Sequence, residues 1–261
     1  MNARRIGAIL SQELFVMYRS GEVIADIFVF PIANIIVFGY LSLYLSANNL
    51  VAGHLVLMGM LLWQMIWIIE YSVTLGSLWN IWSRNLTNLF IAPLRLHEYI
   101  LAHTLSGIVK AIFILIVGGV LSVYLFNFNL LSLGILPLLL IGLNFTLFSY
   151  ALGIVLLGLI FRFGTRIQAV AWGVVSLFQP LCAAFYPLQV MPVALQYLAL
   201  LFPATYTFEA ARYSLIHTDI AWRLLGAAFA ENIVYCILGT MAFMYMYTRS
   251  RDTGQFARNE A

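Results

Sequence analysis

Charged residues are scarce in this chain of 261 residues. Only 9% of the residues are charged, whereas 63% are hydrophobic and the mean hydropathy is +0.97. Because soluble domains carry about 25% charged residues, this composition excludes a water-soluble enzyme, a nucleic-acid-binding module and a disordered linker. We therefore predict an integral membrane protein with no sizeable soluble domain.

Lysine and cysteine are almost absent as well. The one lysine, Lys110, has no glycine-rich loop before it and no serine or threonine after it, which excludes a phosphate-binding G-x-x-x-x-G-K-[ST] loop. The chain is therefore expected to bind no cofactor and to hydrolyse no ATP itself. Cys182 and Cys236 lie in apolar stretches and suggest neither a disulfide framework nor a metal site. The histidines lack the H-E-x-x-H spacing and are interpreted as interfacial: His54, His97, His103 and His217.

Apolar runs are what the sequence has in abundance. Six of them reach the roughly 20 residues that a helix needs to cross a bilayer. They are continuously apolar, whereas the strands of a membrane barrel would alternate over about 10 residues, so the predicted fold is an all-α polytopic membrane protein with six transmembrane helices. The chain is interpreted as one transmembrane domain, 1–261, with spans at about 23–45, 51–75, 100–125, 134–159, 167–185 and 224–247.

The first 22 residues differ from the spans. Apolar residues recur there at intervals of three and four, at Ile6, Leu10, Leu14 and Met17, which predicts an amphipathic helix on the membrane surface. A signal peptide is the alternative, but Glu13 and its polar neighbours interrupt the apolar run, so no cleavage is expected.

The basic residues give the orientation. Since cytoplasmic loops are enriched in Lys and Arg, the side that carries most of them is predicted to be cytoplasmic, together with both termini. The linkers 46–50 and 126–133 carry no charge and are expected outside, as are Arg212 and Arg223. Ten of the thirteen basic residues fall on the cytoplasmic side: Arg4, Arg5, Arg19, Arg84, Arg95, Arg162, Arg166, Arg249, Arg251 and Arg258.

A few ionisable residues lie inside the predicted spans, where a charge costs at least ~2.5 kcal/mol. Glu70 and Lys110 lie at depths that differ by roughly 5 Å, so we predict that they form an intramembrane polar pair. Such a pair is either structural or part of a substrate path or subunit interface. Other polar residues inside or beside the predicted spans are weaker candidates for such a role: Glu231, Gln64, Asn144 and Gln179.

Two connecting segments stand out. Residues 79–98 are typical of a short amphipathic helix that Pro93 ends, and such an elbow is either an inert connector or a helix that docks on a partner. Between the fifth and sixth predicted spans, the apolar run from Pro192 to Pro203 is too short to cross. Residues 187–213 are therefore predicted to form a pair of outer re-entrant or interfacial helices.

Both segments resemble those of type-2 ABC exporter permeases. The elbow N-L-F-I-A-P-L-R-L-H-E-Y is similar to the connection between the second and third spans of that family. The stretch from Phe185 to Arg212, with its three spaced prolines followed by Glu and Arg, resembles the family's outer segment more closely. With the amphipathic start and the six-span layout, the resemblance covers nearly the whole chain.

The resemblance implies site residues, which the composition by itself does not give. It implies an outer gate that includes Pro187, Pro192, Pro203, Glu209 and Arg212. It also implies a cytoplasmic coupling helix to an ATPase subunit, formed by Arg84, Asn85, Leu86, Asn88, Leu89, Phe90, Pro93 and Arg95.

The resemblance further implies a permease subunit without a catalytic site. Such a subunit pairs with a second copy, here expected as a homodimer, and with two P-loop ATPase subunits that bind ATP and Mg. Family members move drugs, lipids or lipid-linked polysaccharides outward, and a bacterial inner membrane is the expected location, with membrane lipid and no nucleic acid as surroundings. The alternatives are an ion-coupled transporter or channel that uses Glu70, Lys110 and Glu231, and a membrane enzyme, which the missing catalytic clusters disfavour.

The predicted topology is testable by cysteine labelling. A cysteine introduced at Ser46 or Asn129 should react with an impermeant thiol reagent in intact cells, because both positions are expected outside. A cysteine at Asn88 or Thr253 should react only after the membrane is made permeable. The reverse pattern would contradict the orientation.

Overall fold

The fold consists of helices. The computed structural model describes residues 2–47, 49–83, 85, 94–217 and 219–253, with the backbone alone for residues 165, 168 and 170–172. This part of the chain contains no β-strand. The predicted all-α polytopic membrane fold is confirmed.

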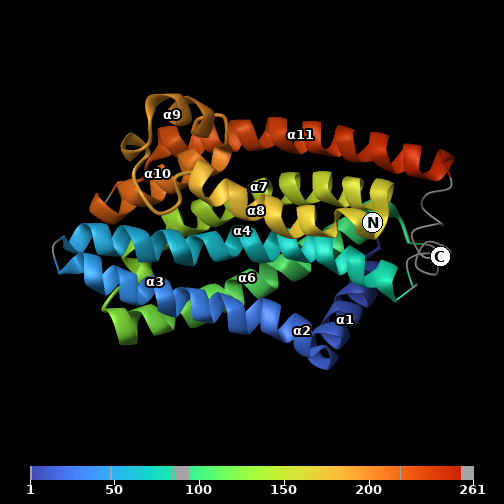
Figure 1. Ribbon diagram of the computed structural model, residues 1–261, viewed down its shortest axis with the longest axis horizontal. Helices are drawn as coiled ribbons and strands as arrows, with labels where there is room; N and C mark the ends of the chain where they lie inside the picture. The colour runs from blue at the N-terminus through green and yellow to red at the C-terminus, as the bar shows by residue number, and fades with distance from the viewer. Residues whose placement is uncertain (1, 48, 84, 86–93, 218, 254–261) are drawn as a thin grey trace.

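Five helices in the described part are long and apolar enough to cross a membrane. They correspond to the first four predicted spans and the sixth. Figure 1 shows α4 in the middle of the bundle, with α3 and α6 on one side and α7, α8 and α11 on the other. The five are the continuous helix α2 (Gly21–Ile24), η1 (Ala25–Val29) and α3 (Phe30–Ser46), then α4 (Leu50–Trp82), α6 (Leu96–Phe126), α7 (Ile135–Phe163) and α11 (Trp222–Asp252).

The fifth predicted span, 167–185, contains a shorter helix than expected. It consists of the 3₁₀ turn η3 (Gly164–Ile167) and α8 (Gln168–Leu181), whose 14 residues extend about 21 Å against the ~30 Å of a hydrocarbon core. Gly164 has a φ of 68° and separates α8 from α7, while Ala183, at a φ of 50°, follows its end. A crossing at this place stays a prediction.

The expected N-terminal helix is present as α1 (Ala3–Arg19), and one side of it packs against the bundle. Ile9 and Glu13 are buried against the bundle. Leu14, which was expected on the apolar side toward the membrane, is 58% exposed, and its neighbours Phe15 and Tyr18 are also exposed. The helix therefore presents a partly polar side to the protein and leaves large apolar side chains for lipid.

The predicted outer segment forms two short helices, α9 (Val193–Ala199) and α10 (Pro203–Ile216), after the 3₁₀ turn η4 (Leu188–Val190). Figure 1 shows α9 and α10 toward one end of the bundle and α1 toward the other. Pro187 and Pro192 directly precede η4 and α9, and Pro203 is the first residue of α10. Proline suits a helix start because its missing N–H would have no helical partner there.

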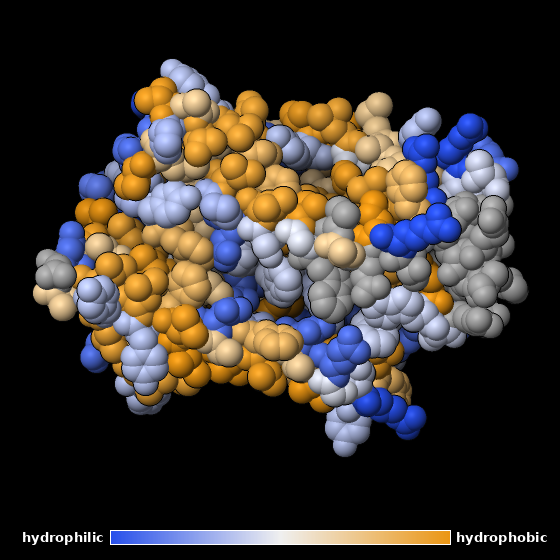
Figure 2. Space-filling view, viewed as in Figure 1, coloured by the Kyte–Doolittle hydropathy of each residue, from blue (hydrophilic) through white to orange (hydrophobic). Residues whose placement is uncertain are grey.

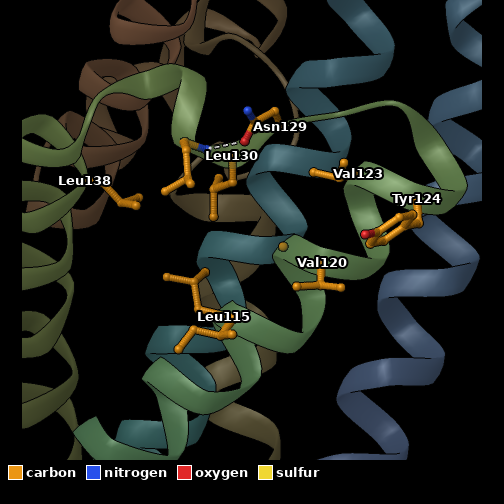
Figure 3. A pocket seen from close by; sticks show the side chains of 10 residues that line it. Leu115, Val120, Val123, Tyr124, Asn129, Leu130 and Leu138 are labelled. Atoms are coloured by element: carbon orange, nitrogen blue, oxygen red, sulfur yellow. Dashed lines mark hydrogen bonds between the residues drawn. The ribbon is translucent and has the colours of Figure 1, made fainter.

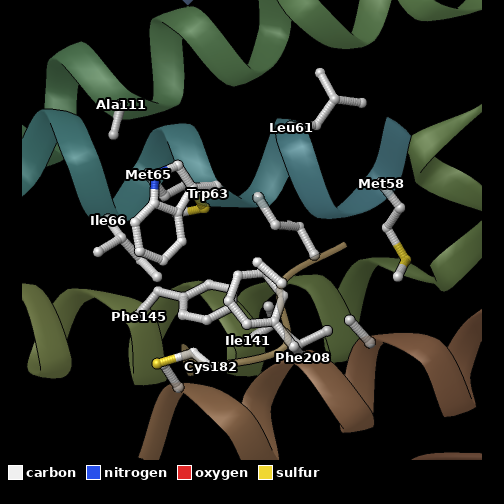
Figure 4. Packing of buried hydrophobic residues seen from close by; sticks show 14 of the residues in the cluster. Met58, Leu61, Trp63, Met65, Ile66, Ala111, Ile141, Phe145, Cys182 and Phe208 are labelled. Atoms are coloured by element: carbon white, nitrogen blue, oxygen red, sulfur yellow. The ribbon is translucent and has the colours of Figure 1, made fainter. Parts of the chain in front are cut away.

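The core lies where α4 meets α7 and α10. Trp63 and Phe145 both contact Phe208 of α10, with ring centroids 6.3 Å and 4.7 Å apart. Figure 4 shows these rings between α4 and α10, with Met58, Leu61 and Ile66 along α4. Since α4 is apolar on nearly all sides and buried along most of its length, it acts as the axis of the bundle.

Gly107 sets the distance between α4 and α6. A Cβ atom at Gly107 would lie 2.8 Å from the Cα of Ile69, so Gly107→Ala must push the two helices apart. We expect a loss of about 1–3 kcal/mol in the free energy of unfolding, measured by denaturant titration in micelles. Gly119→Ala on the same helix is the matched control, because nothing lies within 4 Å of its Cβ position, and it should be neutral or stabilising. Equal effects would refute the role of Gly107.

Candidate functional site

A groove with a polar lining opens on the face formed by α3, α4 and α8. Its volume is about 200 Å³. Figure 2 shows polar side chains gathered in a hollow of this face between apolar surfaces. The described lining consists of Asp26, Phe30, Pro31, Asn34 and Phe38 from η1 and α3, Met60, Trp63, Gln64 and Trp67 from α4, and Ser176 and Gln179 from α8.

Asp26 lies on the π-helical turn η1, at the start of the first membrane-spanning helix. Pro31 follows this turn closely; it cannot donate a backbone hydrogen bond, and its ring crowds the preceding turn, so a wider turn is favoured here. The hydroxyl of Tyr71 on α4 donates a hydrogen bond of 2.8 Å to Asp26 Oδ2. The sequence therefore creates an irregular turn that holds a carboxylate at the groove.

A second cavity, of about 340 Å³, lies between α6, α7 and the 3₁₀ turn η2 (Leu130–Leu133), and it is chemically different. Figure 3 shows that leucine and valine side chains dominate its wall. Asn129 belongs to the lining, but its side-chain oxygen accepts a hydrogen bond from the backbone N–H of Leu131. This cavity suits lipid chains and offers no charged group from its described lining, so the polar groove is the better candidate site.

Lys110 pairs with Glu13 of α1, and the predicted Glu70–Lys110 pair is wrong. Lys110 Nζ lies 2.8 Å from Glu13 Oε2, and His103 Nδ1 lies 3.4 Å from Glu13 Oε1. Gly76 makes room for this cluster, because a Cβ there would lie 2.6 Å from His103 Nδ1. Matching of depths along two helices says nothing about the direction in which each side chain points, which is why the prediction failed.

The buried cluster affects the ionisation of Glu13. Burial alone would raise the pKa of this carboxyl, but the positive charges of His103 and Lys110 and the hydrogen bond from Lys110 outweigh burial and lower the pKa. A lowered pKa means that the cluster stabilises the fold at and above the ordinary pKa of glutamate. This contribution is lost as the pH falls through the lowered value.

Glu70 has a local partner instead. It is 3% exposed, and Thr74 Oγ1 donates a hydrogen bond of 2.8 Å to its Oε1. No hydrogen bond or ion pair in the described residues joins Glu70 to Lys110. His103 is also buried rather than interfacial, at 1% exposure.

Helix α1 contacts the helices on both sides of the predicted elbow. Gln12 Nε2 donates a hydrogen bond of 2.6 Å to Asn80 Oδ1 near the end of α4. At the start of α6, Glu98 accepts a hydrogen bond of 2.8 Å from the backbone N–H of Asn2 and lies 3.5 Å from Arg5 Nη1. α1 therefore connects the end of α4 to the start of α6.

The predicted coupling residues are described only in part. The backbone N–H of Asn85 donates to the carbonyl of Asn80, at 2.9 Å, and Arg95 caps α6, its own N–H donating to Glu98 at 3.1 Å. The remaining residues lie outside the described part of the chain: Arg84, Leu86, Asn88, Leu89, Phe90 and Pro93.

The structure brings several predicted outer residues together. Glu209 Oε1 accepts hydrogen bonds from the backbone N–H of Leu188, at 2.8 Å, and from Arg212 Nη2, at 3.0 Å. Glu209 thereby joins the turn after Pro187 to α10. Two nitrogens of Arg212, Nε and Nη1, are buried without a hydrogen-bond partner in the described residues.

The other predicted polar residues are spread through the molecule. Glu231, half-buried on α11, has a buried oxygen without a partner among the described residues. Asn232 Nδ2 donates to Asn144 Oδ1, at 3.1 Å, which ties α11 to α7. Gln64 and Gln179 both line the groove.

Two important residues were missed by the sequence reading. Asp26 lies within the first predicted span, and the criterion that selected Glu70 would have found it. Glu13 carried no such signal, because a carboxylate in an amphipathic helix normally faces water. Only the packing of α1 on α6 makes it a buried partner of Lys110.

Comparison with known proteins identifies a family. The family described as ABC-2 type transporter matches residues 4–216 of the chain. No curated protein matches the sequence.

The Glu13–Lys110 pair is testable with a double-mutant cycle. Glu13→Gln or Lys110→Met alone should each cost about 3–5 kcal/mol in the free energy of unfolding in micelles, because each leaves its partner buried and unpaired. The double variant should cost clearly less than the sum of the two.

Two controls sharpen this cycle. Glu22→Gln removes an exposed acid and should change little. Glu70→Gln should add to Lys110→Met without coupling, since the two residues do not pair. Coupling of Lys110 to Glu70 in place of Glu13 would contradict the arrangement.

Proposed function

Because the chain belongs to the ABC-2 type transporter family and is thus a permease subunit of an ABC transporter, we propose that it exports an amphipathic or hydrophobic cargo through the polar groove. The groove between α3, α4 and α8 is the observation that carries this proposal. Drugs, lipids and lipid-linked polysaccharides are the cargo classes considered.

The chemistry of the groove supports a path for cargo. Polar side chains inside a membrane are costly unless the protein satisfies them or they serve function. The groove collects the amides of Asn34, Gln64 and Gln179 around an open space, together with a carboxylate. An amphipathic molecule could place its polar part among these groups and its apolar part against the aromatic side chains.

The end of the bundle that holds α1 is proposed to face the cytoplasm. Most of the described basic residues gather at this end of the bundle. They belong to α1, the start of α6, the end of α7 with η3, and the end of α11, whereas Arg212 and Arg223 lie toward the other end. This distribution supports cytoplasmic termini by the enrichment of Lys and Arg in cytoplasmic loops. A bacterial inner membrane remains the proposed location.

A separate ATPase subunit is proposed to supply the energy by way of the elbow at residues 84–95. This subunit would bind ATP and Mg, and two ATPase subunits would act on two copies of the permease. Because α1 bonds to Asn80 of α4 and Glu98 of α6, a push on the elbow would move three helices together. Of these three, α4 carries groove residues, and so does the helix into which α1 continues.

The alternative function, an ion-coupled transporter or channel, has less support. Its relay would require Glu70, Lys110 and Glu231 to act in sequence, but Lys110 is bound to Glu13 and Glu70 to Thr74. No hydrogen bond or ion pair connects these three residues in the described part of the chain.

The test blocks the groove and leaves its surroundings intact. In inside-out vesicles that contain the permease with its ATPase subunit, Ser176→Trp should abolish ATP-dependent uptake of every cationic, neutral or anionic amphiphilic dye that the unmodified complex transports. Leu177→Trp, at an exposed neighbouring position outside the groove lining, should retain uptake. Uptake that needs no ATP, or that survives Ser176→Trp, would contradict the proposal.

A further inference from the structure

We propose that the groove selects hydrophobic cations. This inference rests on the proposed function and narrows its cargo class. It is drawn from the charge of the lining, the aromatic side chains beside that charge and the absence of a counter-ion within the described residues.

Asp26 determines the sign of the charge in the groove. Among the described lining residues it is the one acidic residue, and none of them is basic. Its hydrogen bond from Tyr71 is made by a neutral hydroxyl and leaves the negative charge uncompensated. None of the ion pairs in the described part of the chain includes Asp26. A half-buried carboxylate in a membrane span is costly, and a bound cation would offset that cost.

Aromatic side chains complete the site. Phe30 and Phe38 lie on the same helix as Asp26, and Trp63 and Trp67 line the α4 side. Ring faces attract cations, tryptophan most strongly, and they also accept apolar groups of a cargo molecule. A carboxylate beside several rings is therefore suited to an organic cation with hydrophobic substituents.

The same lining disfavours anionic cargo. A phosphate or carboxylate group in the groove would meet the like charge of Asp26 and find no Lys or Arg in the described lining. Lys110 is occupied by Glu13 and does not belong to this lining. Of the cargo classes left open by the family, cationic amphiphilic drugs thus fit better than lipid-linked polysaccharides with their phosphate groups.

Two probe ions of nearly equal shape and opposite charge test the inference. The full chain in phosphatidylcholine nanodiscs would be titrated separately with tetraphenylphosphonium and tetraphenylborate by calorimetry, with empty nanodiscs as the blank. The cation should bind at least about tenfold more tightly than the anion. Equal or reversed affinities, or no saturable binding of the cation, would overturn the inference without any variant being made.

Variants then locate the selectivity. Asp26→Asn should weaken binding of the cation about tenfold and reduce the difference in affinity between the two ions. Asp26→Glu keeps the carboxylate and should preserve most of that difference in affinity. Glu22→Gln is the matched control, since it removes an acid on the preceding turn that does not line the groove, and the affinity should stay unchanged. Unchanged binding in correctly folded Asp26→Asn would contradict the assignment of Asp26.

The two proposals fail in different ways. One outcome is that the unmodified protein binds both ions with equal affinity and that Ser176→Trp removes the binding of both. The groove would then bind ligands, and only the proposed charge selectivity would be wrong. If selective binding of the cation survives Ser176→Trp, the ligand does not occupy the groove, and both proposals are wrong.

Discussion

The lack of hydrogen-bond partners in a lipid bilayer is the constraint from which the rest of this structure follows. Every polar group inside the spans must find its partner within the protein or bear a large cost. Lys110 meets this requirement by reaching Glu13, and Glu70 by accepting a hydrogen bond from Thr74. Asn232 does so by bonding to Asn144. These bonds join α1 to α6 and α7 to α11, so the satisfaction of polar groups and the packing of helices are one process.

The carboxylate of the groove differs from that of Glu70 because it faces an open space. Asp26 receives one hydrogen bond from Tyr71 but has no cation beside it in the described part of the protein. The π-helical turn that carries it is also irregular. Irregular helical turns and unpaired charges cost stability, and sites of function are where such costs are commonly tolerated. A transport path needs this combination, because groups that are already fully paired have nothing to offer a passing molecule.

Helix α1 gives the bundle a mechanical link. It is anchored by a buried ion pair to α6, by Gln12 to Asn80 of α4 and by its own N-terminus to Glu98. Its chain continues directly into the helix that carries Asp26. A displacement at the ends of α4 and α6 would therefore reach the groove through α1 as well as through α4. In this arrangement the carboxylate of Glu13 lies on the protein-facing side of the helix, where it pairs with Lys110.

The sequence by itself determined the class of the protein, because composition and the length of apolar runs do not depend on how helices pack. The all-α membrane fold, five of the spans, the helical N-terminal segment and the two short helices that follow or begin at prolines could all be predicted from the sequence. The resemblance of the elbow and the outer stretch also led to the family that residues 4–216 match. The length of α8 was less accessible, since the helix begins after the break at Gly164 and ends before Ala183, within an apolar stretch of sequence.

Only the tertiary structure decided which polar residues meet. Depth in the bilayer follows from position along a helix, but the direction of a side chain around the helix depends on which neighbour packs against it. Lys110 could therefore be assigned to Glu70 by depth, although its partner is Glu13, 97 positions away in the sequence on a helix expected to lie on the membrane surface. In the same way, Asp26, Gln64 and Gln179 become one groove only because α3, α4 and α8 enclose a common space, and no spacing in the sequence encodes that packing.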